Sequence, residues 1–259
     1  MTEISDISQT RSNRGDVHLE RFAMRVVARI AGRAPIRAEE TDPELLKLLV
    51  RQARTGDPAV LNAVFTHLNR ERISADEVVD RHIPAAARSL GDAWHDGDLD
   101  ILETTLAITR LQALLRELGR AWTADHAGTA SEARVILVVP QREQHTLGAL
   151  IAAQQLRRAG VSVNLQFLVT QPKLTVLLAE SSYDAVFISV ANRSNLENCK
   201  ELVKSAKGSV FRSNPVVVGG ALLGEIHNLK ELTGADVVTN DVGHALDACG
   251  LRSYNHAAQ

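Results

Sequence analysis

Five short apolar segments in the second half of the chain constrain its fold more than any other feature. The first, third and fourth are apolar almost throughout, which is typical of strands buried on both faces of a parallel sheet. A segment with helical period follows each of the five. Strict alternation of this kind predicts an α/β domain with a doubly wound parallel sheet. The expected strands are 135–139, 163–168, 185–190, 215–220 and 235–239, and the expected helices are 146–159, 173–181, 195–206, 222–231 and 243–250.

The first half of the chain has helical period instead, so we expect an α domain followed by the α/β domain. A segment of small and polar residues separates the two halves. A helical bundle with short connections accounts for the first half. The predicted organisation is a disordered N-terminus at 1–15, a helical bundle with an Arg-rich first helix at 16–124, a linker at 125–133 and the α/β domain at 134–259.

Capping residues mark several helix starts in the bundle, because an Asp or Ser oxygen can accept from the free N–H groups of a first turn. Pro84 is expected to kink or interrupt its helix. Either Asp98 or Asp100 opens a long helix through the apolar residues of 102–118. The other predicted starts are Asp42-Pro43, Asp57-Pro58 and a capping box formed by Ser74 and Glu77.

The net charge of −2 gives the chain no global field that would hold nucleic acid. The local exception is the first predicted helix, where arginines recur every four residues from Arg21 to Arg37 and form one stripe. This stripe is either a solvated helix face or a docking surface for an acidic partner or DNA, and both interpretations stay open.

No segment approaches the roughly 18 to 20 continuous apolar residues that span a bilayer, and the N-terminus has no apolar core of the signal-peptide type. We therefore expect a cytoplasmic protein without a membrane partner. Cys199 and Cys249 form neither a metal motif nor a disulfide framework and are expected to be small buried residues. The sequence shows no Ser/His/Asp nucleophile motif, phosphate loop or zinc spacing, so no catalytic residue is predicted.

A glutamate and a histidine lie two residues apart where the first predicted strand gives way to a helix. His145 therefore stands at the carboxyl edge of the sheet, where doubly wound sheets bind ligands. A neutral imidazole is a good ligand for a transition metal, and Glu143 can accept the proton on the other ring nitrogen. Gly148 follows in the first turn of the helix, where glycine costs stability. A bulky group held against the backbone would explain it.

Small residues end the third and fourth predicted strands. Ser189 and Ala191 close the third strand, and Gly219 and Gly220 close the fourth, so that a ligand can approach the backbone closely. Together they predict a deep slot beside the sheet, which suits an extended group better than a compact substrate.

These segments resemble the cobalamin-binding domain of the base-off, His-on type, whose pattern is Asp-x-His-x-x-Gly, then Ser-x-Leu or Ser-x-Thr, then Gly-Gly. The resemblance implies a Rossmann-like, flavodoxin-like domain in which His145 is the lower axial ligand of cobalt. Ser189 and the two glycines would line the slot for the displaced dimethylbenzimidazole tail. Glu143 stands in place of the aspartate of the pattern. The segments here read Glu143-Gln-His145-Thr-Leu-Gly148, Ser189-Val-Ala191 and Gly219-Gly220.

The helical half adds to the resemblance, because a bundle that caps the corrin precedes the cobalamin domain in methyl-transfer enzymes and in photoreceptor repressors. In the photoreceptor members a Trp is followed by Gly three residues on and by Glu-His ten residues on. Trp94 and Gly97 fit the first part, which implies that Trp94 contacts the cofactor. The Glu-His pair packs around an adenosyl group in that family, but here it falls on Thr104-Thr105. The hydroxo or aquo form of cobalamin is therefore favoured over the adenosyl or methyl form.

In length and order the chain resembles the AerR/PpaA group of cobalamin-binding antirepressors of purple photosynthetic bacteria. The resemblance implies a photoreceptor, a light-responsive transcription regulator and not an enzyme, which antagonises a repressor of photosynthesis genes. The expected partner is that repressor protein. DNA contact, through the partner or through the Arg21–Arg37 stripe, stays open, and the sequence predicts no oligomeric state.

Two other functions fit parts of the sequence. A corrinoid carrier subunit of a methyltransferase is the alternative, because the same bundle and cobalamin domain serve in such proteins. A receiver-like module is disfavoured, because the first and third strands are followed by Pro140-Gln141 and Asn192-Arg193 instead of by the required acids.

Overall fold

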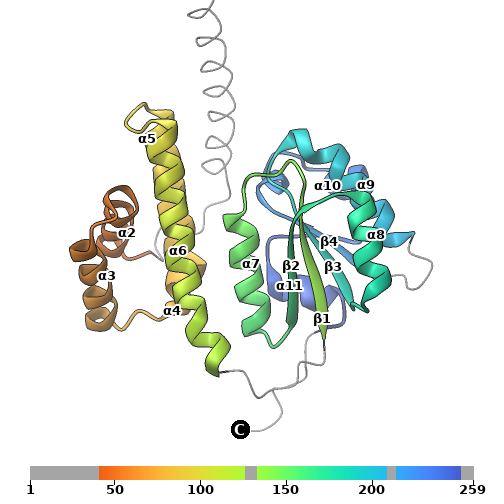
Figure 1. Ribbon diagram of the computed structural model, residues 1–259, viewed down its shortest axis with the longest axis horizontal. Coiled ribbons are helices and arrows are strands. Elements are labelled where there is room, and N and C mark those ends of the chain that lie inside the picture. The colour runs from red at the N-terminus through yellow and green to blue at the C-terminus, as the bar shows by residue number, and fades with distance from the viewer. Residues whose placement is uncertain (1–40, 126–132, 209–213, 252–259) are drawn as a thin grey trace, which may run out of the picture. The chain divides into compact units, whose positions relative to one another are not determined.

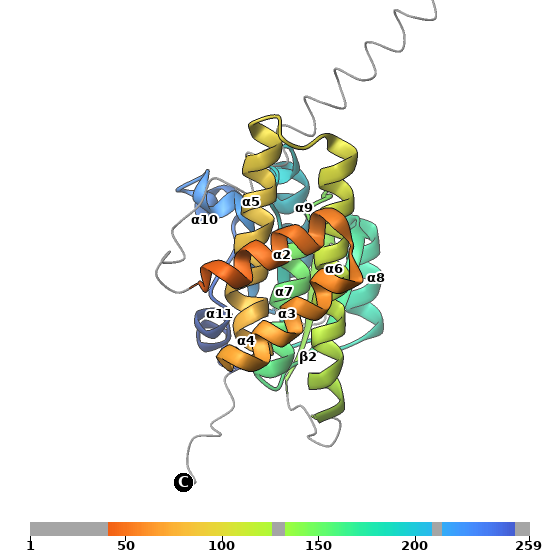
Figure 2. The ribbon, with the colours of Figure 1, turned by 90° about the vertical axis from the view of Figure 1, so that its left-hand side faces the viewer.

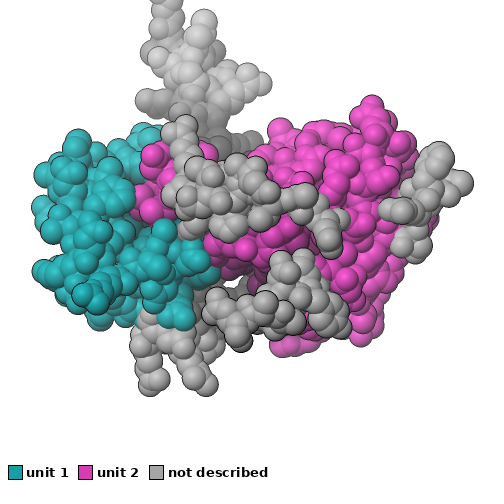
Figure 3. All heavy atoms as spheres, turned by 90° about the horizontal axis from the view of Figure 1, so that it is seen from below, with its two compact units in different colours: residues 1–111 teal, residues 112–259 magenta. Residues whose placement is uncertain are grey.

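The computed structural model describes residues 41–125, 133–208 and 214–251 (Figure 1). The predicted disordered segment 1–15, the Arg-rich first helix with its Arg21–Arg37 stripe and most of the predicted linker 125–133 lie outside the described residues. The chain divides into two compact units, Met1–Leu111 and Gln112–Gln259, which meet in sequence within one long helix (Figure 3). Each unit is described by itself below.

The first unit is helical, as its period predicts. Asp42 and Asp57 cap the first two described helices by accepting from backbone N–H groups, and Ser74 and Glu77 form the expected capping box. Asp100 and Glu103 cap each other's backbone N–H, so that the long helix begins after Asp100 and not after Asp98. The elements are α2 (Pro43–Thr55), α3 (Pro58–Glu71), α4 (Ala75–Glu77), the π-helix η2 (Val78–His82), α5 (Ile83–His95) and the first part of α6 (Ile101–Asp125).

Pro84 does not break its helix sharply, because the turn before it is π-helical. The backbone stays in the right-handed helical region through His82 and Ile83, and Pro84 falls in the first turn of α5. A proline in a first turn lacks only an N–H that would be unpaired in any case. The π-helical turn therefore accommodates the proline without ending the run of helix.

Two buried histidines belong to the core of the first unit. His82 accepts a hydrogen bond from the backbone N–H of Asp42 at 3.0 Å, and the Asp42 carboxylate lies 3.1 Å from His67 Nε2. These contacts fix the start of α2 to α3 and η2. Figure 2 shows α2 lying across α5. Fully buried apolar side chains, Leu45, Leu49, Ile83 and Leu90 among them, fill the space between these helices.

The second unit contains a five-stranded sheet in which every strand pair is parallel, with the order β2-β1-β3-β4-β5. This order reverses direction between β1 and β3, and doubly wound sheets usually bind ligands at the carboxyl edge of such a reversal point. The strands are β1 (Arg134–Pro140), β2 (Ser162–Val169), β3 (Ala185–Ser189), β4 (Val216–Gly219) and β5 (Val237–Val238).

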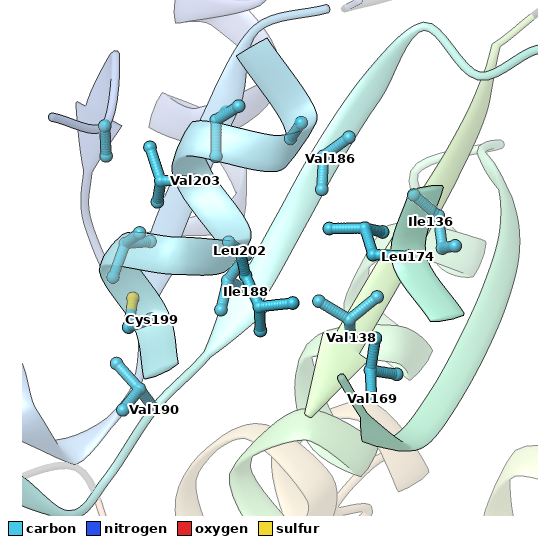
Figure 4. Close-up of a cluster of buried hydrophobic side chains, with 14 of the residues drawn as sticks. Ile136, Val138, Val169, Leu174, Val186, Ile188, Val190, Cys199, Leu202 and Val203 are labelled. Atoms are coloured by element: carbon cyan, nitrogen blue, oxygen red, sulfur yellow. The ribbon is translucent and has the colours of Figure 1, made fainter. Parts of the chain in front are cut away.

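Side chains of alternate parity along the strands fill two cores, one on each face of the sheet. Ile136, Val138 and Ile188 pack with α8 (Gln171–Glu180) and α9 (Leu196–Lys207), as Figure 4 shows. Val135 and Leu137 face the other way, toward α7 (Leu147–Arg158) and α11 (Val242–Ala248). A strand that is buried on both faces must be apolar at every position, which explains the continuous apolar runs in β1, β3 and β4. The predicted fold class is confirmed.

One segment near the end of the chain differs from the sequence prediction. Residues 222–231 do not form one helix but the 3-10 turn η4 (Ala221–Gly224) and the short α10 (Leu229–Thr233). Gly224 is the last residue of η4, and a glycine weakens a helix by about 1 kcal/mol relative to alanine. No helix in the described ranges is long and apolar enough to span a membrane.

Candidate functional site

The candidate site lies at the carboxyl edge of the sheet, where the strand order reverses. Glu143 and His145 are in the loop that joins β1 to α7, and Ala191, Asn192 and Asn195 follow β3. The structure thus brings the loops after β1 and β3 together, as the crevice of a doubly wound sheet requires.

The Glu143 carboxylate connects these two loops through five hydrogen bonds. Its Oε1 atom accepts from the backbone N–H of His145 at 3.0 Å and lies 2.5 Å from His145 Nδ1. Its Oε2 atom accepts from the backbone N–H groups of Ala191 and Asn192, both at 2.9 Å, and from Asn195 Nδ2 at 3.1 Å. One carboxylate therefore contacts both loops.

Burial and hydrogen bonding act on the Glu143 carboxyl in opposite directions. The side chain is only 2% exposed, and burial by itself raises the pKa of a carboxyl group. The hydrogen bond and charge interaction with His145, together with the backbone N–H donors of Ala191 and His145, outweigh burial and lower the pKa of Glu143 from 4.5 to about 2. The carboxylate is ionised at neutral pH and acts as a fixed acceptor.

A fixed acceptor determines which tautomer His145 adopts. An ionised carboxylate has no proton to donate, so Nδ1 carries the hydrogen and donates it to Glu143 Oε1. In the neutral ring Nε2 then presents a lone pair. Among the residues that the structure describes, His145 Nε2 is the one buried side-chain nitrogen or oxygen atom with no hydrogen-bond partner.

This unpartnered nitrogen fits an axial ligand of cobalt. A buried acceptor left without a partner costs about 1–3 kcal/mol, so a metal that took up the lone pair would remove that cost. A neutral imidazole whose other nitrogen donates to a carboxylate is the usual arrangement of a histidine metal ligand. A single protein nitrogen suits a metal that a macrocycle already chelates, as the corrin ring does. The residues present therefore fit the group.

The small residues of the predicted slot lie where the sequence placed them. Ser189 and Gly219 are paired in the register of β3 and β4. Gly220 has a φ of 110°, and a Cβ there would lie 2.3 Å from the carbonyl oxygen of Val190. The approach of the loop after β3 thus already requires glycine at this position. A Cβ on Gly148 would meet nothing within 4 Å, so the packing of the described residues does not demand glycine in that turn.

Two asparagines that sequence reasoning missed hold the site in shape. Asn195 is fully buried and donates to Glu143 Oε2. Asn240 forms two hydrogen bonds with the backbone of Gly220. Its Oδ1 accepts from the Gly220 N–H at 2.6 Å, and its Nδ2 donates to the Gly220 carbonyl at 3.2 Å. Asn240 lies two residues beyond the end of β5, and Asn195 ends the short 3-10 turn η3 (Arg193–Asn195) that follows β3. Polar residues at the carboxyl ends of buried strands were the available signal.

Trp94 belongs to the first unit, where its side chain is half-buried near the end of α5. Its predicted contact with the cofactor stays a prediction. Thr104 and Thr105 direct their hydroxyl groups to carbonyl oxygens of their own helix, at 2.8 and 2.7 Å. Cys199 is buried as expected, and burial raises the pKa of its thiol to about 12. Cys249 is half-buried.

Comparison with known proteins first defines the class. Residues 133–249 match the family model described as the B12 binding domain. These residues include the whole sheet and the Glu143–His145 loop. The chain is a cobalamin-binding protein of the class that carries this domain.

A relative then places the chain in a narrower family. A protein of Rhodobacter capsulatus, described as an uncharacterized 20.5 kDa protein in the bchF-crtJ intergenic region, is 39% identical over 191 residues. The match covers 74% of this chain and 100% of the relative. The chain belongs to the same family as that protein.

One solved structure agrees with the fold. The monomethylamine corrinoid protein of Methanosarcina barkeri matches with a TM-score of 0.63 at 15% identity, covering 81% of this chain and 96% of that chain. A novel cobalamin-binding protein from Desulfitobacterium hafniense matches with a TM-score of 0.45 at 18% identity, covering 79% of this chain and 97% of that chain. The corrinoid protein shares the arrangement of a helical region followed by a five-stranded parallel sheet.

Proposed function

We propose that this protein is a light-responsive, cobalamin-binding transcription regulator that acts as an antirepressor through a repressor of photosynthesis genes. The observation that carries the proposal is the buried Nε2 of His145, whose lone pair has no partner and whose ring is oriented by Glu143. His145 would be the lower axial ligand of cobalt, and Gly148, Ser189, Ala191, Gly219 and Gly220 would line the slot for the displaced tail.

Each residue of the site has a separate task in this proposal. Glu143 keeps the proton of His145 on Nδ1, and so keeps Nε2 available as a ligand. Asn195 and the backbone N–H groups after β3 hold Glu143 in place. Bound cobalamin supplies a cobalt centre whose upper ligand light can remove. Trp94 would contact that upper face, where a hydroxo or aquo ligand is favoured.

The regulatory part of the proposal is supported by the relative from Rhodobacter capsulatus. The name of that protein places it in the bchF-crtJ intergenic region, within a region of photosynthesis genes. A regulator of this kind needs two states that the cofactor populates differently. A change of the bound cofactor in light would shift the balance between them.

A corrinoid carrier of a methyltransferase is the second candidate. The likeness in fold to the monomethylamine corrinoid protein of Methanosarcina barkeri favours it. The two candidates share His145 as ligand and differ in what the bound cobalt does. Transfer of the methyl group from the methylcobalamin-loaded protein to a thiol would support the carrier and count against the regulator.

The ligand role of His145 is tested by titrating the apo-protein with hydroxocobalamin and following the absorption spectrum. His145→Ala should weaken binding by about tenfold or more, because the ligand is lost. His244→Ala is the matched control, since His244 is an exposed residue of α11 in the same unit. Equal affinity of the His145→Ala variant and the wild type would rule out the axial role.

The regulatory role is tested with the holo-protein in darkness and after illumination. We expect the absorption spectrum to change on illumination and the affinity for the purified repressor to change with it. A spectrum and a repressor affinity that are both the same in light and darkness would refute a light-responsive regulator, while leaving cobalamin binding intact.

A further inference from the structure

A groove with a volume of about 560 Å³ runs along α2 in the first unit. One residue of α5, Ser89, lies at its edge. Figure 2 shows α2 across the face of the helices beneath it. The α2 residues that line the groove are Leu46, Lys47, Val50, Arg51, Arg54 and Thr55.

Three cations line this groove at positions that share one face of α2. Lys47, Arg51 and Arg54 follow one another at four and three residues, which places them in a row along a helix. All three are exposed. Lys47 lies 4.0 Å from Glu44, an exposed pair that contributes little. Within the described part of the chain, neither Arg51 nor Arg54 forms an ion pair with a carboxylate, so their charges are available to a ligand.

The positive charge of the groove contrasts with the rest of residues 41–111, the part of this unit that the structure describes. Residues 41–111 contain eight Lys and Arg against twelve Asp and Glu, a formal net charge of −4. Three of these eight cations line one groove. Within residues 41–111, negative charge outside the groove would repel a polyanion, while the groove would attract a short acidic segment.

The groove also offers apolar contact. Leu46 and Val50 are half-buried and line the groove together with the cations. Leu46 comes one residue before Lys47, and Val50 comes one residue before Arg51. A ligand that used the whole groove would therefore carry carboxylates and apolar side chains together. A phosphate backbone uses only the cations, whereas an amphipathic helix laid in a groove uses both kinds of contact.

We propose that this groove is a docking site for an acidic amphipathic segment of a partner protein. Its carboxylates would pair with Lys47, Arg51 and Arg54, and its apolar side chains would cover Leu46 and Val50. All residues that line the groove belong to the first unit. Arg51 and Arg54 would give charge-assisted, bidentate pairs with carboxylates, which fix the direction of the segment.

The test measures binding of a fluorescein-labelled model peptide by fluorescence anisotropy. The peptide is a helix of about 15 residues with glutamates at i, i+4 and i+7 and leucines beside them. We expect saturable binding that weakens with added salt. Arg51→Glu with Arg54→Glu should reduce affinity by about tenfold or more. Lys204→Glu, an equal change of charge per site on the exposed face of α9 in the other unit, is the control and should leave binding unchanged.

Reciprocal exchange of charge makes the test specific. A peptide with lysines in place of the glutamates should bind the doubly reversed protein better than it binds the wild type. The variant Arg51→Gln with Arg54→Gln replaces both charges with amides of similar polarity, and should lose affinity for the acidic peptide while keeping the helical circular dichroism signal.

Several results would overturn the proposal. One is the absence of saturable binding up to about 1 mM peptide, the weak end of specific recognition. Another is equal binding by the wild type and both double variants. Tighter binding of duplex DNA than of the peptide, lost in the same variants, would make the groove a phosphate site instead. His145→Ala should leave peptide binding unchanged, so failure of the proposed cobalamin role and failure of this proposal are distinguishable.

Discussion

Replacing Glu143 with glutamine should disturb the candidate site more than any other change of similar size. The side chain keeps its shape, but one acceptor oxygen becomes an NH2 group that can only donate. The native carboxylate accepts from five donors, two on His145 and three in the loop after β3. Whichever way the amide turns, at least one of these donors loses its acceptor.

The number of donors left without an acceptor decides which way the amide turns. If the amide oxygen faces His145, the three donors of Ala191, Asn192 and Asn195 all meet an NH2 group. If it faces the β3 loop, only the backbone N–H of His145 is left over, because the imidazole can shift its proton to Nε2 and accept at Nδ1. Each buried donor without an acceptor costs about 1–3 kcal/mol. The second orientation is therefore favoured, and the variant should be about 1–3 kcal/mol less stable than the wild type.

The favoured orientation of the amide also removes the metal ligand. With the proton on Nε2, that nitrogen has no lone pair to offer, and cobalamin affinity should fall by about tenfold to a hundredfold. Urea unfolding of the apo-protein measures the first effect and titration with hydroxocobalamin measures the second. Gln144→Ala, an exposed change in the same loop, is the control. A Glu143→Gln variant with wild-type stability and affinity would refute the reasoning about the tautomer.

Two further substitutions and a pH titration test the contacts around the site. Gly220→Ala should destabilise the protein by about 2–4 kcal/mol in urea unfolding, since its Cβ would lie 2.3 Å from the Val190 carbonyl oxygen. Gly160→Ala is the control, because Gly160 also has a positive φ but a Cβ there would meet nothing within 4 Å. This control should lose only about 1 kcal/mol of stability. Asn195→Ala should lower the free energy of unfolding by about 1–3 kcal/mol and weaken cobalamin binding, because one donor to Glu143 is lost. Unchanged cobalamin binding would show that the backbone N–H donors alone hold the carboxylate. Because the pKa of Glu143 falls from 4.5 to about 2 on folding, about 3 kcal/mol of stability should be present above pH 4.5 and lost as the pH falls toward 2. Urea midpoints of the apo-protein across this range should show that loss, and a Glu143→Gln variant with the same pH dependence would contradict it.

The strand alternation was enough to predict the sheet and its class, because burial on both faces leaves a continuous apolar run that few other structures produce. Prediction was weaker where an element is short. Residues 235–239 contain a strand of only two residues, Val237–Val238, and 222–231 divide into two short turns of helix. The π-helical turn at Val78–His82 was also missed, since its sequence has ordinary helical period.

The candidate site was predictable where its residues are adjacent in sequence. Glu143 and His145 stand two residues apart after a buried strand, so a hydrogen bond between them could be expected from the sequence. Asn195 could not be assigned in this way, because its contact with Glu143 joins residues 52 positions apart. An asparagine in a loop usually bonds to its own backbone, and only the folded arrangement shows that this one supports a distant carboxylate.

The hydrogen bonds from Ala191, Asn192 and Asn195 to Glu143 also set an order of events during synthesis. The histidine leaves the ribosome about fifty residues before the loop that immobilises its neighbour, as the separation of 48 to 52 positions requires. Until β3 has joined β1, only the two donors of His145 itself contact the Glu143 carboxylate, and nothing fixes its other oxygen. A nascent or truncated chain that stops before residue 195 should therefore stay colourless in the presence of free cobalamin. The appearance of colour on the growing chain would report that the central strands have assembled.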